Sequence, residues 1–132
     1  MNALTSYNKG RFAELYACAY LFLKGYVPLE RRYKTPVGEI DIIARRGSNI
    51  VFFEVKYRES QGAAGESITA LAKTRISRAA EYYMAAQARK HEASAKKLSE
   101  IASGYRSYNQ SVQIDAVVID RYFRIKHIKN AW

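Results

Sequence analysis

Two apolar runs separated by a short polar segment lie between Gly38 and Lys56. The polar segment is Arg46 to Asn49, and a break of this kind between two apolar runs predicts a β-hairpin. A two-residue turn at Gly47 and Ser48 pairs Arg46 with Asn49 and leaves one face of the hairpin wholly apolar. The residues expected on that face are Ile40, Ile42, Ala44, Val51, Phe53 and Val55.

The other face of this hairpin carries charged side chains at positions where a buried strand would have none. In the same register Asp41 faces Glu54, and Glu39 faces Lys56. Directly opposed residues have Cβ atoms about 4.5–5.5 Å apart. Two neighbouring carboxylates are unfavourable unless a positive group lies between them. Either a divalent metal ion or Lys56 with nearby arginines meets this requirement, and the hairpin alone does not decide between them.

The rest of the chain predicts helices and strands on both sides of the hairpin. The helices are expected from about Ser6 to Lys24, Thr69 to Ala88 and His91 to Ser103, and the strands at Tyr26 to Tyr33, Val112 to Asp120 and Phe123 to Ile128. This order, with additions at the C-terminal end, predicts an α/β fold with a mixed sheet flanked by helices on both faces.

Apolar residues recur at helical spacing in the two longer expected helices. In the first helix a broad apolar stripe is formed by Phe12, Leu15, Tyr16, Ala19, Phe22 and Leu23. In the second, the buried side is expected to comprise Leu71, Ile76, Ala79, Ala80 and Tyr83.

Length and charge narrow the class of protein. The chain of 132 residues has the usual size of one domain, so residues 1–132 are expected to form a single domain. Lysine and arginine number 22 against 12 acids, which gives a net charge of +10. Such an excess favours a polyanionic partner, nucleic acid before an acidic membrane surface, over charge that serves solubility alone.

The cysteine count, the N-terminal pattern and the lengths of the apolar runs indicate the cellular compartment. A single cysteine, Cys18, excludes an internal disulfide and fits a reducing environment. The N-terminus lacks the pattern of a signal peptide, and no apolar run approaches the length that crosses a bilayer. These features predict a cytoplasmic protein without a membrane partner.

Three acids and one lysine form the candidate site. Glu54 and Lys56 lie two residues apart in a strand and therefore point to the same face. Asp41 and Glu54 can hold one or two hard cations through carboxylate oxygens, and Glu14 on the first helix can add a further contact. The simpler interpretation of Glu14 is a solvated side chain or a pair with Arg11. A bound metal would activate a water molecule, which Lys56 could orient or help to deprotonate.

These residues also carry a family resemblance. Asp41 followed by Glu54-Val55-Lys56 resembles the PD-(D/E)XK nuclease motif of restriction-endonuclease-like folds. More closely, the chain resembles the YraN-like family of small bacterial endonuclease-like proteins. The segments that carry this resemblance are Gly10 to Glu14, Gly38 to Ile43, Phe52 to Arg58 and Lys73 to Tyr83, with a weaker fifth at Ile114 to Val118.

The resemblance implies a restriction-endonuclease-like core of order α-β-β-β-α-β, as in Holliday-junction resolvases and tRNA-splicing endonucleases. It implies that Glu14, Asp41, Glu54 and Lys56 form the catalytic site and that Lys73 contacts phosphate. The chain departs from the family pattern at Ala13, at Gln113-Ile114 and in a longer segment from about Arg89 to Gln110. These departures affect the expected substrate geometry and leave the four site positions in place.

We therefore expect a nuclease dependent on Mg²⁺ or Mn²⁺ that acts on DNA rather than RNA, on branched or single-stranded substrates. Its nucleic-acid contacts are expected at Arg58, Lys73, Arg75 and Arg78, which belong to short basic clusters beside the site. Analogy with junction-resolving enzymes of this fold class suggests a homodimer. The alternative is a non-catalytic nucleic-acid-binding module that retains the nuclease fold.

Overall fold

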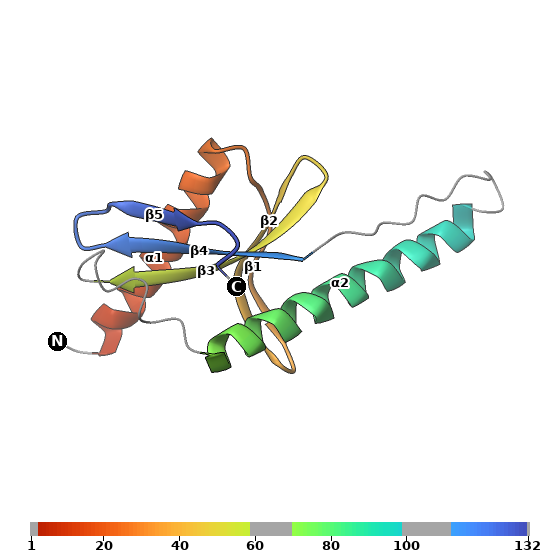
Figure 1. Ribbon diagram of the computed structural model, residues 1–132, viewed down its shortest axis with the longest axis horizontal. Coiled ribbons are helices and arrows are strands. Elements are labelled where there is room, and N and C mark those ends of the chain that lie inside the picture. The colour runs from red at the N-terminus through yellow and green to blue at the C-terminus, as the bar shows by residue number, and fades with distance from the viewer. Residues whose placement is uncertain (1–2, 59–69, 99–111, 132) are drawn as a thin grey trace.

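A computed structural model describes residues 3–58, 70–98 and 112–131 (Figure 1). The elements in this part of the chain are α1 (Ala3–Leu23), β1 (Val27–Thr35), β2 (Gly38–Arg46), β3 (Asn49–Arg58), α2 (Ala70–Leu98), β4 (Gln113–Asp120) and β5 (Ile125–Ile128). This confirms the expected α/β order with its C-terminal addition. The helix start expected at Thr69 and the helix end expected at Ser103 lie outside the described residues. No helix in the described ranges is long and apolar enough to cross a membrane.

The five strands form one mixed sheet in the order β1-β2-β3-β4-β5. β3 and β4 are parallel, and the other neighbouring strands are antiparallel. A parallel pair requires a crossover connection, and α2 lies in the connection between β3 and β4. The two helices cover opposite faces of the sheet, because neighbouring residues such as Phe52 and Phe53 belong to separate buried clusters.

The face under α1 is packed with small helical residues. Ala13 and Ala17 are buried against the sheet together with Leu21, whereas Phe12 and Leu15 are more than half exposed. Most of the predicted apolar stripe is therefore exposed, since Phe12, Leu15, Ala19, Phe22 and Leu23 all lie on the surface. The helix is apolar on several sides, so its periodicity alone did not identify the buried side. The two alanines allow the helix to lie close to the sheet.

The face under α2 follows the expectation more closely. Ile76, Ala79, Ala80 and Tyr83 are buried there, while Leu71 is exposed. The expected division of this region into two helices was wrong, because α2 is continuous from Ala70 to Leu98. No glycine or proline interrupts the segment, and its many alanines favour an unbroken helix.

The hairpin has the predicted turn and register. Arg46 pairs with Asn49, Ala44 with Val51, and Ile42 with Phe53. Gly47 has a φ of 62°, the left-handed conformation that two-residue hairpin turns require.

The regular pairing of β2 with β3 ends at Ile42 and Phe53, so the expected pairs of Asp41 with Glu54 and of Glu39 with Lys56 fall outside it. Ile40 is also not on the expected face. It lies in the α2-side cluster, although Ile42 lies in the α1-side cluster. Residues two apart in a regular strand share a face. The alternation of β2 is therefore interrupted at Asp41.

Candidate active site

Asp41 lies where β2 and β3 stop pairing. Its Oδ2 accepts a hydrogen bond of 2.8 Å from the backbone N–H of Val55. In a continuous ladder, Val55 would face Ile40 across the two strands. The Asp41 side chain instead satisfies this backbone donor, which places a carboxylate between the strands, beside Glu54.

The surroundings of Asp41 disfavour its negative charge. Burial raises the pKa of Asp41 from an ordinary 3.8 to about 7. The hydrogen bond from Val55 lowers this pKa, and the negative charges of Glu54, Glu14 and Glu39 raise it again. Among the described residues, no lysine or arginine forms an ion pair with Asp41. The structure therefore places the predicted acids within electrostatic reach of a carboxylate that has no positive partner in the described chain.

Glu54 and Lys56 lie together on β3. The Nζ of Lys56 is 2.8 Å from Oε1 of Glu54, and the two side chains are 24% and 18% exposed, respectively. This confirms the expectation that the two side chains share one face. It corrects the predicted pairing of Lys56 with Glu39, since the end of the ladder at Phe53 removes that opposition and leaves Glu54 as the neighbour.

Glu14 reaches the same region from α1. Its Oε2 lies 2.6 Å from Nε of Arg32 on β1, and the Glu14 side chain is 17% exposed. The sequence suggested Arg11 or solvent as its partner and did not identify Arg32. Arg32 has a φ of 52°, a left-handed conformation that is unusual for a residue other than glycine. Nothing in the local sequence of β1 signals this conformation, so the partner was not predictable from spacing.

The predicted nucleic-acid contacts flank these acids. Lys73, Arg75 and Arg78 are exposed on the first turns of α2. The backbone of Arg75 lies so close to Gly38 that a Cβ atom at that glycine would be 3.3 Å from the Arg75 carbonyl oxygen. The basic end of α2 is therefore packed against the beginning of β2, three residues before Asp41. Arg58 ends β3 and donates a hydrogen bond of 2.9 Å to the carbonyl of Tyr57.

The donor chemistry of this site fits a hard divalent cation. Glu14, Asp41 and Glu54 offer only carboxylate oxygens, the ligands that Mg²⁺ prefers. Asp41, which is half-buried, also lacks the positive charge that such an ion would provide. Within the described ranges, however, no three such side chains are already arranged as a metal cage. One oxygen of Glu54 is engaged by Lys56 and one oxygen of Glu14 by Arg32, so a shared ion would take the second oxygen of each side chain or open these ion pairs.

Comparison with known proteins places the site within a shared region. A family model described as "Uncharacterised protein family UPF0102" matches residues 13–119, which include all four candidate site residues. A UPF0102 protein of Rhizobium etli is 44% identical over 80 residues, which cover 61% of this chain and 66% of the relative. A UPF0102 protein of Mesorhizobium japonicum is 47% identical over 83 residues, which cover 63% and 66%. The matched region thus covers about two thirds of these relatives.

Proposed function

The chain belongs to the UPF0102 family, described above as YraN-like, and we propose that it is a metal-dependent nuclease that hydrolyses phosphodiester bonds in DNA. The observation that carries this proposal is the Asp41 carboxylate. It has a pKa raised to about 7, it is surrounded by further acids, and it forms no ion pair within the described residues. A cytoplasmic location is part of the same proposal.

A half-buried carboxylate without an ion pair is costly, and strongly perturbed carboxylates of this kind cluster at functional sites. A divalent cation would offset the cost. Glu14, Asp41 and Glu54 would hold Mg²⁺ or Mn²⁺, which when bound lowers the pKa of a water molecule and stabilises charge on phosphate oxygens.

Lys56 has a role of its own in this proposal. Its ammonium group lies beside Glu54 and is partly exposed, so it is able to donate hydrogen bonds to a phosphate oxygen or to the attacking water. Lys73, Arg75, Arg78 and Arg58 supply positive charge around the site for the nucleic-acid backbone. The net charge of +10 supports a polyanionic substrate.

The test is cleavage of labelled DNA with Mg²⁺ or Mn²⁺. The substrates are linear, single-stranded, nicked, flapped and four-way forms, with RNA of matched sequence. Wild-type protein should cut at least one DNA form, and Glu54→Gln and Lys56→Met should cut at least about 100-fold more slowly, the scale of a lost catalytic group. Glu81→Gln and Lys90→Met, on the exposed side of α2, are the matched controls. The proposal would be overturned if the wild-type protein cut none of the DNA forms. It would also be overturned if both site variants cut DNA as fast as the wild type.

A second function is favoured by the two ion pairs. The Glu54–Lys56 and Glu14–Arg32 contacts neutralise two of the three acids without a metal ion. This arrangement suits a non-catalytic module that binds nucleic acid through its basic surface. Its binding would weaken with salt, with log affinity falling by about 0.9 per duplex phosphate contacted for each unit of log salt. Glu54→Gln would leave binding intact or strengthen it, and millimolar Mn²⁺ would not bind.

A further inference from the structure

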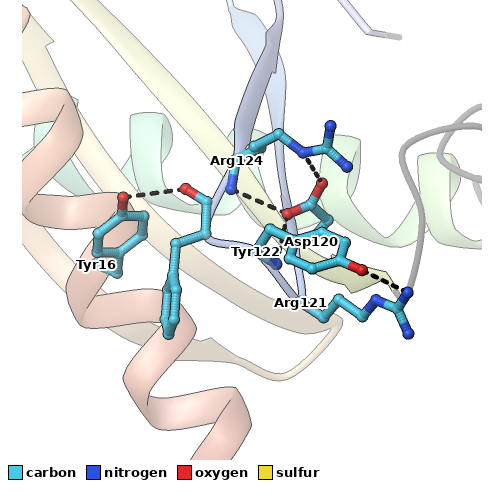
Figure 2. Close-up of polar contacts among 6 residues, drawn as sticks. Tyr16, Asp120, Arg121, Tyr122 and Arg124 are labelled. Carbon is cyan, nitrogen blue, oxygen red and sulfur yellow. Dashed lines mark hydrogen bonds and ion pairs between the residues drawn. The ribbon is translucent and has the colours of Figure 1, made fainter.

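The turn between β4 and β5 is held by one buried carboxylate. Asp120 is only 1% exposed, and its Oδ1 accepts hydrogen bonds from the backbone N–H groups of Tyr122 (2.9 Å) and Arg124 (3.0 Å). Its Oδ2 lies 2.7 Å from Nε of Arg124 (Figure 2). The backbone N–H of Phe123 also bonds to the Asp120 carbonyl, at 3.0 Å. The conformation of this turn is therefore fixed by several hydrogen bonds to one residue.

This ordered turn presents aromatic rings to solvent. Tyr122 is 60% exposed and Phe123 is 53% exposed. Phe123 has a φ of 61°, a conformation that costs about 1–2 kcal/mol in a residue with a Cβ atom. Its carbonyl accepts a hydrogen bond of 3.1 Å from the hydroxyl of Tyr16 on α1. The fold thus holds a large apolar ring outward in a strained conformation instead of burying it.

α1 extends this aromatic surface. Phe12 is 56% exposed, and its ring meets Phe123 edge to face at a centroid distance of 5.9 Å. Tyr16 meets Phe123 in the same manner at 5.6 Å. In an edge-to-face contact the edge of one ring covers one face of the other, so the ring that contributes its edge keeps both faces clear of its partner.

Two arginines surround the exposed tyrosine of the turn. The guanidinium of Arg121 lies 4.7 Å from the centroid of the Tyr122 ring, and that of Arg124 lies 5.2 Å away. Nη2 of Arg121 also donates a hydrogen bond of 2.6 Å to the Tyr122 hydroxyl. The Arg124 side chain is 67% exposed although it pairs with Asp120. Positive charge and aromatic surface are therefore combined in one short segment.

This segment lies at the same end of the sheet as Lys56 of the candidate active site. Phe123 packs against α1, whereas Glu54 and Lys56 alternate with Val55 of the α1-side cluster and so point to the other face. β3 and β4 run in parallel, with Val118 beside Lys56 and Asp120 beside Arg58. At about 3.3 Å per residue, the turn begins roughly 7 Å further along the sheet than Lys56. In Figure 1 the two strands point to the same side of the molecule, and the chain turns there into β5.

We propose that Phe12 and the segment Arg121 to Arg124 form a binding site for an unpaired stretch of a nucleic-acid strand at the same end of the sheet as the active site. Phe12 and Phe123 stack on bases, and Arg121 and Arg124 contact the adjacent phosphates. Bases within a duplex expose no faces for such stacking, whereas aromatic and basic side chains together are typical of single-strand binding. A second copy of this chain is the less suitable occupant, because it carries the same charge of +10.

This binding site would specify the substrate class of the proposed nuclease function. The inference rests on that proposed function, since nucleic acid is taken to be the ligand. A flap, a gapped strand or an open junction offers an unpaired stretch next to the bond to be cut. Continuous duplex DNA does not.

The test is binding of a fluorescently labelled single-stranded oligonucleotide and of its duplex, measured by anisotropy without divalent metal ions. Phe123→Leu keeps an apolar side chain but removes the aromatic face, and it should weaken single-strand binding at least about fivefold. Phe123→Tyr should restore binding to nearly the wild-type affinity. Phe22→Leu is the matched control, because Phe22 is 61% exposed elsewhere on α1, and it should leave binding unchanged.

Unchanged single-strand affinity in Phe123→Leu would overturn the assignment, as would an equal loss of single-strand and duplex binding. So would sedimentation data in which Phe123→Leu converts a dimer to a monomer without loss of single-strand binding. Because cleavage plays no part in this assay, the two proposals fail separately. A protein that never cuts DNA but depends on the Phe123 ring for single-strand binding keeps this site and loses the nuclease function.

Discussion

The side chain of Asp41 takes the place of a backbone acceptor for Val55. Its Oδ2 accepts the Val55 N–H at 2.8 Å, and the regular pairing of β2 with β3 ends one position earlier, at Ile42 and Phe53. The candidate site is therefore formed by an interruption of the sheet. Because the interruption is filled by a carboxylate, it places negative charge where the fold provides no ion-pair partner within the described residues.

This relationship predicts a pH-dependent gain in stability for Asp41→Asn. The folded-state pKa of about 7 exceeds the ordinary value of 3.8, so the folded protein binds more protons than the unfolded chain between these values. Wild-type stability should therefore fall relative to the variant as pH rises from about 4 to about 7. An asparagine oxygen still accepts the Val55 hydrogen bond. Urea unfolding should show the variant more stable by on the order of 1–3 kcal/mol at pH 8, with little difference at pH 4.

Glu39→Gln provides the control for this measurement. Glu39 is exposed and contributes the last of the negative charges that raise the pKa of Asp41. Its removal should stabilise the protein in the same direction but by less. Parallel pH profiles for wild type and Asp41→Asn would contradict the raised pKa.

A divalent metal ion should stabilise the folded protein through the same carboxylate. At a free concentration 100 times its Kd, a ligand that binds only the folded state adds about 2.7 kcal/mol to the free energy of unfolding. We expect Mg²⁺ or Mn²⁺ to raise Tm by several degrees at pH 8. The increase should be smaller at pH 5, because protons then compete for Asp41. Asp41→Asn should largely abolish it, whereas Glu81→Gln on α2 should not. An equal increase in Asp41→Asn would place the ion elsewhere.

The hairpin shows how much of the site was predictable from sequence. Strict alternation and an even turn at Gly47 and Ser48 determined the register, because a shift of one residue would have put Asp41 on the face away from Glu54. The same alternation predicted the wrong face of the sheet for Ile40. No local pattern indicates that a side chain will replace a backbone acceptor at Asp41, since that depends on how two strands diverge in space.

The partner of Glu14 and the buried side of α1 also could not be identified from sequence, because both depend on contacts between distant segments. The pairing of Glu14 with Arg32 depends on a left-handed residue in β1 and on the way α1 crosses that strand. The buried side of α1 is determined by close approach of Ala13 and Ala17 to the sheet, which hydrophobicity alone does not rank above Phe12. Contacts between distant segments thus determine side-chain partners and buried helix faces that the spacing of residues in the sequence does not.

The buried pair of Asp115 and His127 should be important for stability. Asp115 is fully buried on β4, and its Oδ2 lies 2.7 Å from Nε2 of His127 on β5. Its Oδ1 accepts hydrogen bonds from the Gln113 side chain and from the backbone of Asn130. His127→Ala should leave the carboxylate without its main partner and reduce the free energy of unfolding by about 2–4 kcal/mol.

Urea unfolding checks this value against His91→Ala, which changes the other histidine, exposed on α2. That control should alter stability by no more than about 0.5 kcal/mol. Similar losses for the two variants would show that the Asp115–His127 contact contributes little.

The hairpin turn allows the contribution of backbone conformation to stability to be measured separately from that of side-chain contacts. Gly47 has a φ of 62°, and apart from Gly47 and its two chain neighbours no described residue has an atom within 4 Å of the position that a Cβ would occupy. Gly47→Ala should therefore destabilise the protein only through backbone strain, by about 1 kcal/mol. Gly47→Asn should cost less, because asparagine tolerates the left-handed conformation better than alanine. Urea unfolding of both variants tests this order, and a Gly47→Asn variant less stable than Gly47→Ala would contradict the strain explanation.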